Sequence, residues 1–181
     1  MASAYQDRLM NSVCIIAGLL PLAVIIALST AGDFVLFGDF ISELGVGEHA
    51  LVFNASLIVA ALLIIPFVFH AYKRYGYLIV LFLITILSLA GVGFSPLTSE
   101  LHKPLAALFF LLAFASIIAA GTKMIRREGR LASFGLGILG FAGLAVFNPF
   151  TETLLVFAIG LWVAGVGLFY RPHGKSAKIS R

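Results

Sequence analysis

Polar side chains gather in one short stretch of an otherwise apolar chain. Residues 38–56, GDFISELGVGEHALVFNAS, hold three carboxylates, an imidazole, an amide and two hydroxyls, in a chain that is 61% hydrophobic and 11% charged. Carboxylates beside an imidazole provide hydrogen-bond donors and acceptors that suit a lipid head group, a hydroxylated ligand or a divalent metal. The stretch therefore predicts a binding site, without naming a reaction or any catalytic residue.

Two further polar stretches follow, GFSPLTSELHKP at 93–104 and FNPFTET at 147–153. If the three stretches meet at one outer mouth, they bring together Ser42, Glu43, His49, Asn54, Glu100, His102, Asn148 and Glu152. From this set we predict a ligand-binding site formed by Ser42, Glu43, His49, Asn54, His102 and Asn148.

A metal site is an alternative use of the same residues. Imidazole and carboxylate groups are ligands for Zn²⁺, and the candidate ligands are Glu43, His49, Glu100 and His102. The chain has no HExxH motif or similarly spaced ligand set. Cys14 is the single cysteine, so an intrachain disulfide and a cysteine metal site are both excluded.

Composition places the chain in lipid. A mean hydropathy of +1.11 over 181 residues exceeds what a soluble domain of this size can bury. A helix needs about 20 apolar residues to cross a membrane, and we expect spans at 13–31, 50–69, 77–94, 104–121, 133–147 and 153–170. The prediction is a single six-transmembrane-helix bundle over residues 1–181, all α-helical, because the alternating pattern of barrel strands is missing.

The basic residues orient this bundle. With a cytoplasmic N-terminus, all Lys and Arg residues except Lys103 fall on the cytoplasmic side, including those of the basic tail at 171–181. This positive-inside pattern predicts a multi-pass protein of the cell membrane with both termini in the cytoplasm. It also explains the net charge of +4 without nucleic acid as a partner.

Two assignments stay open, that of the apolar run after Arg8 and that of Asn54, and one further segment has an amphipathic pattern. Arg8 before an apolar run resembles a signal peptide, but the run is longer than a usual signal core, so we expect a retained span. Phe37, Phe40, Ile41 and Leu44 form one stripe of a short amphipathic segment in the first outer loop, which GVG at 45–47 ends. Asn54, about one turn inside the second span, either bonds another helix or faces a ligand.

Four motifs resemble those of the DUF998 family, a group of multi-pass membrane proteins of unknown function. They are ISELG in the first outer loop, FNASLI opening the second span, AGVGFSP closing the third and LHKPLAALFFLLA opening the fourth. The resemblance covers roughly residues 10–170 and implies that the family's positions here are Ser42, Gly45, Asn54, Gly93, Pro96 and His102. One departure is visible, because this chain reads Gly-Phe-Ser-Pro where the family tends to read Gly-x-Phe-Pro. The resemblance implies a fold and a site location, and no activity.

Several functions remain open at this stage. The first is a binding or accessory protein that holds a membrane lipid or a small molecule at the outer mouth, or that serves as a subunit of an oligomer or membrane complex. The second is a metal-assisted hydrolase or transferase acting on lipid. A haem or quinone protein with His49 and His102 as axial ligands, or a transporter, are further alternatives.

Overall fold

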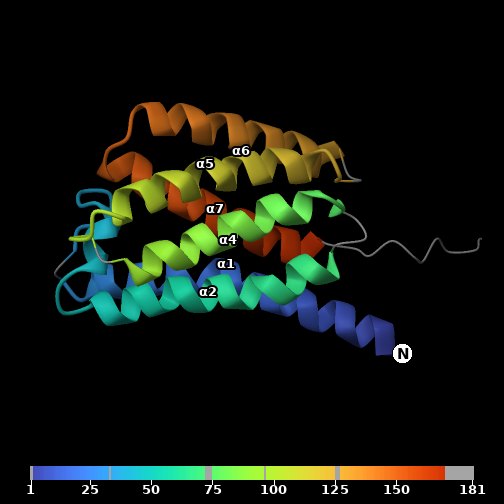
Figure 1. Ribbon diagram of the computed structural model, residues 1–181, viewed down its shortest axis with the longest axis horizontal. Coiled ribbons are helices and arrows are strands. Elements are labelled where there is room, and N and C mark those ends of the chain that lie inside the picture. The colour runs from blue at the N-terminus through green and yellow to red at the C-terminus, as the bar shows by residue number, and fades with distance from the viewer. Residues whose placement is uncertain (1, 33, 72–74, 96, 125–126, 170–181) are drawn as a thin grey trace, which may run out of the picture.

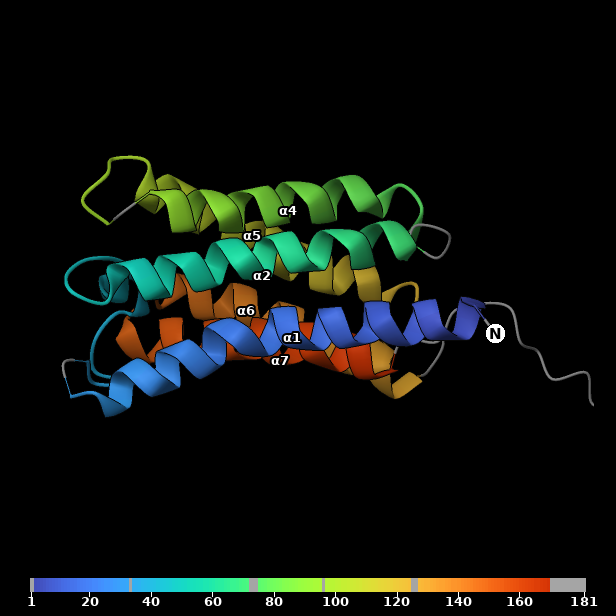
Figure 2. The ribbon, with the colours of Figure 1, turned by 90° about the horizontal axis from the view of Figure 1, so that it is seen from below.

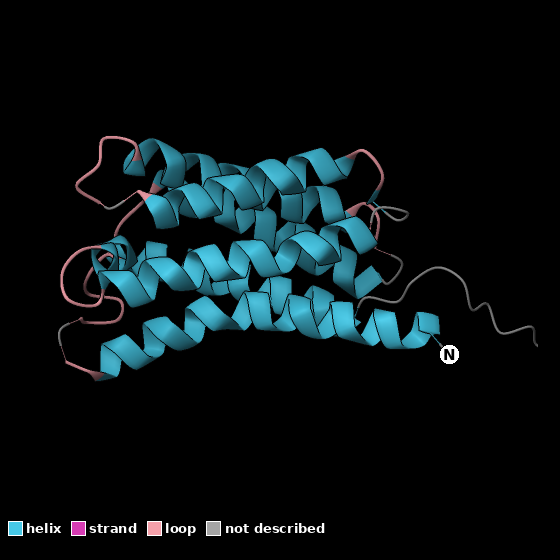
Figure 3. Ribbon diagram, turned by 60° about the horizontal axis from the view of Figure 1, so that its bottom comes forward, coloured by secondary structure: helices cyan, strands magenta, loops and turns pink. Residues whose placement is uncertain are grey.

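The structure, a computed structural model, describes residues 2–32, 34–71, 75–95, 97–124 and 127–169. Within these ranges all regular structure is helical (Figure 3). The elements are α1 (Ala2–Thr30), the short 3-10 helix η1 (Ile41–Gly45), α2 (Ala50–His70), α4 (Leu78–Phe94), α5 (His102–Gly121), α6 (Arg127–Ala145) and α7 (Pro149–Phe169). The all-α prediction is confirmed, and the basic tail at 171–181 lies outside the described residues.

Four helical segments are long and apolar enough to cross a membrane: Tyr5–Thr30, Ala50–His70, His102–Gly121 and Pro149–Leu168. The apolar helix Leu78–Phe94 is shorter. Large apolar side chains also cover the outside of the bundle, with Leu51 81% and Leu139 69% exposed. Such a surface is unfavourable in water, so these helices indicate a membrane protein with several spans.

The helices run along one common axis (Figures 1 and 2). α1 packs between α7 and α2, α2 packs on α4, and α4 packs on α5. α6 packs mainly on α5 and contacts α7 much less. The backbones of α5 and α7 lie farther apart, and side chains such as Phe114 and Leu155 pack between them. The arrangement is a ring of α1, α2, α4, α5 and α7, with α6 outside it against α5.

The two ends of the bundle differ in charge. One end carries the connections from α1 to α2, from α4 to α5 and from α6 to α7 (Figure 1); its described charged residues are Asp39, Glu43, Glu48, Glu100, Lys103 and Glu152. We call it the acidic end. The opposite end, here the basic end, has the described charged residues Asp7, Arg8, Lys123, Arg127, Glu128 and Arg130. The three polar stretches of the sequence therefore do meet at one end of the molecule.

Small residues close the ring between its first and last helices. A Cβ added at Gly160 would lie 2.7 Å from the carbonyl oxygen of Gly18, and one at Gly167 would lie 2.7 Å from that of Asn11. The backbones of α1 and α7 thus touch directly, as small residues permit within membrane bundles. Because backbone cannot move aside like a flexible side chain, this seam requires glycine.

Candidate functional site

A long apolar cavity runs through the middle of the ring. It has a volume of about 190 Å³ and is lined from α1, α2, α4, α5, α7 and η1, while none of the described residues of α6 lines it. Along α5 its wall extends from His102 to Ala120, which is about 27 Å at 1.5 Å per residue. A membrane's hydrocarbon core is about 30 Å thick, so the cavity is long enough for most of a lipid chain.

Polar side chains are few on this wall. Ser42, His102 and Glu152 lie at the acidic end, Thr85 and Ser116 lie midway, and Cys14, Tyr75 and Trp162 lie nearer the basic end. The rest of the wall is mainly aliphatic and aromatic. The cavity is therefore chemically polarised along its length.

His102 is the first residue of α5 and is only 2% exposed. Its Nδ1 lies 2.6 Å from the carbonyl oxygen of Ser95, the residue after α4. Because a carbonyl oxygen only accepts, Nδ1 donates this hydrogen bond, and in the neutral ring Nε2 is then an acceptor. Nε2 is buried without a hydrogen-bond partner among the described residues. The turn between α4 and α5 thus fixes the ring and leaves an acceptor on a residue of the cavity wall.

The start of α7 is built by two reciprocal caps. Asn148 Oδ1 accepts from the backbone N–H of Thr151 at 2.9 Å, and Thr151 Oγ1 accepts from the backbone N–H of Asn148 at 2.8 Å. Pro149 occupies the first helical position, where its missing N–H costs no helix bond. These local interactions fix where α7 begins, and so they place Glu152 inside its first turn.

Glu152 faces the ring interior from that first turn and is only 5% exposed. Its carboxyl group accepts hydrogen bonds from the backbone of Ile41 and Ser42 and from the Ser42 hydroxyl. The second carboxyl oxygen, Oε2, is buried without a partner in the described part of the chain. Glu152 therefore both holds η1 at the end of the cavity and offers a free acceptor.

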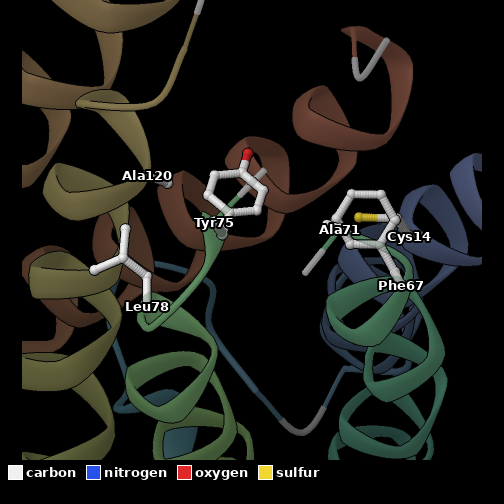
Figure 4. Close-up of a cluster of buried hydrophobic side chains, with 6 residues drawn as sticks. All are labelled: Cys14, Phe67, Ala71, Tyr75, Leu78 and Ala120. Atoms are coloured by element: carbon white, nitrogen blue, oxygen red, sulfur yellow. The ribbon is translucent and has the colours of Figure 1, made fainter. Parts of the chain in front are cut away.

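Polar groups elsewhere along the cavity have partners. Trp162 Nε1 donates to Ser133 Oγ at 3.0 Å, and the Thr85 and Ser116 hydroxyls lie 3.0 Å apart. Cys14 Sγ donates to the carbonyl oxygen of Val163 at 3.3 Å. Figure 4 shows the neighbouring cluster, in which the Phe67 ring lies against Cys14 and the Tyr75 ring is directed toward Ala120. This half of the wall is packed and hydrogen-bonded.

Aromatic rings connect the acidic end of the cavity to the surface of the bundle. The rings of Phe40 and Phe147 stack with centroids 5.9 Å apart, and Phe147 meets Phe110 edge-on at 6.0 Å. Phe110 lines the cavity, whereas Phe147 is 46% exposed. Phe37 packs on Phe150 at 5.5 Å and has a positive φ of 68°, which is unusual for a bulky side chain.

The predicted ligand-binding residues divide into two groups. Ser42 and His102 line the cavity. Glu43 is exposed and His49 is half-buried just before α2, and Asn148 caps α7. The amide of Asn54 donates to the Gly45 carbonyl oxygen at 3.2 Å, so of its two expected roles the structure shows a contact with η1. None of these last four lines the cavity within the described ranges.

No group of three or more His, Cys, Asp or Glu side chains is placed to hold a metal ion in the part of the chain that the structure describes. Of the four predicted metal ligands, His102 is buried on the cavity wall, while Glu43 and Glu100 are exposed. A metal site therefore stays a prediction from residue types alone.

Glu152 gains a role that its sequence position obscured. With a sixth span expected at 153–170, Glu152 was expected in an outer loop that could reach the outer mouth and was left out of the predicted ligand-binding set. Instead α7 begins at Pro149, and Glu152 is a buried helical residue. The Asn-Pro-x-Thr pattern before it was the available signal, because Asn caps and first-turn prolines mark helix starts. The amphipathic segment also differs from expectation, since only Ile41–Gly45 is helical and Phe37 lies in a turn.

The fold and the cavity define a class, an all-helical membrane protein with several spans around an interior apolar cavity. The model of the family described as protein of unknown function (DUF998) matches residues 14–168, and the chain belongs to this family. The suspected resemblance is thereby confirmed. No curated protein and no solved structure matches the chain.

The family positions implied by the motifs fall into two structural groups. Ser42 and His102 lie on the cavity wall. Gly45, Asn54 and Gly93 form a packing joint, because a Cβ at Gly45 would lie 3.2 Å from Asn54 Oδ1 and one at Gly93 would lie 2.9 Å from the Asn54 carbonyl oxygen. The joint connects η1, α2 and α4. Pro96 lies outside the described residues.

Proposed function

We propose that this protein binds an amphiphilic lipid inside its helix bundle, with the chain in the cavity and the polar head at the acidic end. One observation carries the proposal. Two buried acceptors, His102 Nε2 and Glu152 Oε2, lack partners among the described residues, and both residues line the same end of an apolar cavity. Buried polar atoms without partners cost about 1–3 kcal/mol each, so an occupant that bonds them is strongly favoured.

The volume of the cavity supports the same proposal. Protein interiors contain few voids larger than a water molecule. If about 190 Å³ stayed empty, the side chains of the wall would lose van der Waals contacts along the length of the cavity. Water is a poor occupant of a mainly apolar wall, whereas a hydrocarbon chain contacts it along its whole length.

The charge of the two ends supports a topology for this function. We place the basic end in the cytoplasm, following the positive-inside rule, and the acidic end outside, with six crossings and cytoplasmic termini. α4 has 17 residues and reaches about 25 Å, which suffices for a thin or adapted bilayer. The head group then lies at the outer face of the cell membrane.

Impermeant thiol labelling of intact cells tests this topology. Single cysteines replace exposed Glu100 at the acidic end or exposed Arg127 at the basic end, in a Cys14→Ala background. We expect Glu100→Cys to react in intact cells and Arg127→Cys to react only after the membrane is opened. Reaction of both in intact cells would contradict the topology and leave the binding proposal standing.

Quenching of Trp162 tests chain binding directly, because it is the single tryptophan and lies on the cavity wall. An amphiphile brominated in mid-chain should quench its fluorescence saturably in purified protein. Ala113→Leu narrows the cavity from the buried face of α5 and should abolish this quenching. Ala107→Leu, on the exposed face of the same helix, is the matched control and should bind normally. Equal quenching in both variants would place the probe outside the bundle and refute the proposal.

A further inference from the structure

We propose that the ligand is a single-chain lipid whose head is an uncharged hydroxyl group, a long-chain alcohol in chemical class. The inference rests on the proposed function and specifies its head and its chain. Three independent features of the site carry it: the type of free polar atom, the charge around it and the shape of the cavity.

Both free polar atoms can accept a hydrogen bond. Nδ1 of His102 is used by Ser95, which leaves Nε2. The donors at this end are already used, because the backbone and hydroxyl of Ser42 bond the Glu152 carboxyl group. His102 Nε2 therefore needs a donor that no described residue supplies, and the ligand must provide it. A hydroxyl group donates, while an ether or ester oxygen only accepts.

The surrounding charge excludes an anionic head. No Lys or Arg lines the cavity in the described ranges, and the charged groups described around its acidic end are carboxylates apart from Lys103. A phosphate or carboxylate head would bury a negative charge in a medium of low dielectric constant with no Lys or Arg of the described lining to compensate it, which is strongly unfavourable. An ammonium head carries a full charge and three N–H donors. With two free acceptors, one of its N–H groups stays buried without a partner, which costs more for a charged group than an unused acceptor costs beside a neutral hydroxyl.

The shape of the cavity limits the number of chains. Its volume of about 190 Å³ is spread over about 27 Å of α5, so it is long and narrow. Two hydrocarbon chains side by side do not fit such a space without separating the helices. A single chain fits along it, with the head between η1 and the first residues of α5 and α7.

Displacement of the brominated probe by four compounds of equal chain length tests the inference. The competitors are hexadecanol, hexadecyl methyl ether, palmitate and hexadecylamine, each measured by recovery of Trp162 fluorescence. We expect hexadecanol to displace the probe at least tenfold better than the other three. Equal or better displacement by the ether, the acid or the amine overturns the inference, while absence of saturable quenching by the probe overturns the proposed function itself.

Glu152→Gln keeps the shape of the side chain and exchanges the free carboxyl oxygen for an amide NH₂ group, which only donates. Backbone and hydroxyl donors from Ile41 and Ser42 hold the remaining amide oxygen, so the amide NH₂ takes the place of the free Oε2. An acceptor becomes a donor, and the preference for hexadecanol over its methyl ether should fall at least fivefold. An unchanged preference would show that Glu152 does not contact the head.

His102→Asn supplies a second variant, should Glu152→Gln fold poorly. An asparagine amide can donate to the Ser95 carbonyl oxygen in place of Nδ1, while the Nε2 acceptor is removed. We expect about a tenfold loss of hexadecanol affinity and no change for hexadecyl methyl ether. A parallel loss for both compounds would indicate a merely structural role for the ring and overturn the assignment of Nε2 to the head.

Discussion

The two ends of one cavity treat their polar groups differently. Toward the basic end, the indole of Trp162 and the thiol of Cys14 each have a partner within the protein. At the acidic end, His102 and Glu152 each have one partnered atom and one buried atom without a partner in the described ranges. The polar groups at the basic end of the cavity are thus satisfied within the protein, whereas in the proposed function a ligand supplies the missing partners at the acidic end. Stability and binding should therefore respond to different residues.

The largest expected effect on stability lies toward the basic end of the cavity. Ser133→Ala removes the acceptor of the Trp162 indole and leaves a buried donor, which costs about 1–3 kcal/mol. Denaturation of ligand-free protein in detergent should show this loss, with probe affinity nearly unchanged. Adding Trp162→Phe removes the orphaned donor and should recover part of the stability. A large loss of affinity in Ser133→Ala would break the comparison.

A smaller effect distinguishes the head end from the tail end. Ala120 is fully buried and lines the cavity near the basic end. Ala120→Leu should shorten the cavity there, so long alcohols should lose about tenfold in affinity while shorter ones keep theirs. Affinity for a series of chain lengths measures the shift in the optimum. Equal weakening of short and long alcohols would contradict the proposed orientation, with the head at the acidic end and the chain end near Ala120.

The hydroxyl pair midway along the cavity provides a weaker test. Thr85 donates to the Leu81 carbonyl oxygen, so Ser116 donates to Thr85 in their 3.0 Å contact. Hydrogen bonds between membrane helices contribute up to about 1.7 kcal/mol, and Ser116→Ala should lose that amount or less. Thermal denaturation should register the loss in apo protein. If the affinity for hexadecanol fell by as much as the stability, the hydroxyl head would contact Ser116, midway along the cavity, and not only the acidic end.

The smallest effect is expected at the packing joint. Asn54→Leu removes the hydrogen bond to Gly45, and such bonds average about 0.6 kcal/mol. The melting temperature in detergent should fall slightly. The affinity for the probe should stay unchanged, because Asn54 is not among the described residues of the cavity wall. Loss of probe binding at unchanged stability would instead indicate that Asn54 contacts the ligand.

Helix positions were readable because apolar runs determine them. α2 occupies Ala50–His70 against an expected 50–69, and α4 occupies Leu78–Phe94 against 77–94. The larger errors are at polar ends, where helices continue past the apolar run, while α6 ends at Ala145, short of the expected 147. α1 begins at Ala2 and α6 at Arg127, earlier than the expected 13 and 133. Polar residues can continue a helix outside the apolar region, so the apolar run marks only the part of the helix that lies in lipid.

The site was only partly readable for a related reason. Ser42 and His102 could be chosen by type and by their common end of the bundle. Whether a polar residue near a helix start faces water or the interior depends on its angle around the helix. One turn of error at α7 changed Glu152 from a loop residue into a cavity residue, while Glu43 beside Ser42 stayed in solvent. Side-chain direction of this kind needs the packed bundle.

The glycine seam between α1 and α7 has a consequence for biosynthesis. These are the first and last described helices, and their contact closes the ring. During synthesis the ring therefore stays open on the side of α1 until α7 has entered the membrane. A lipid chain that lies between the helices at that moment is enclosed as the seam forms, so loading and final assembly can be a single event.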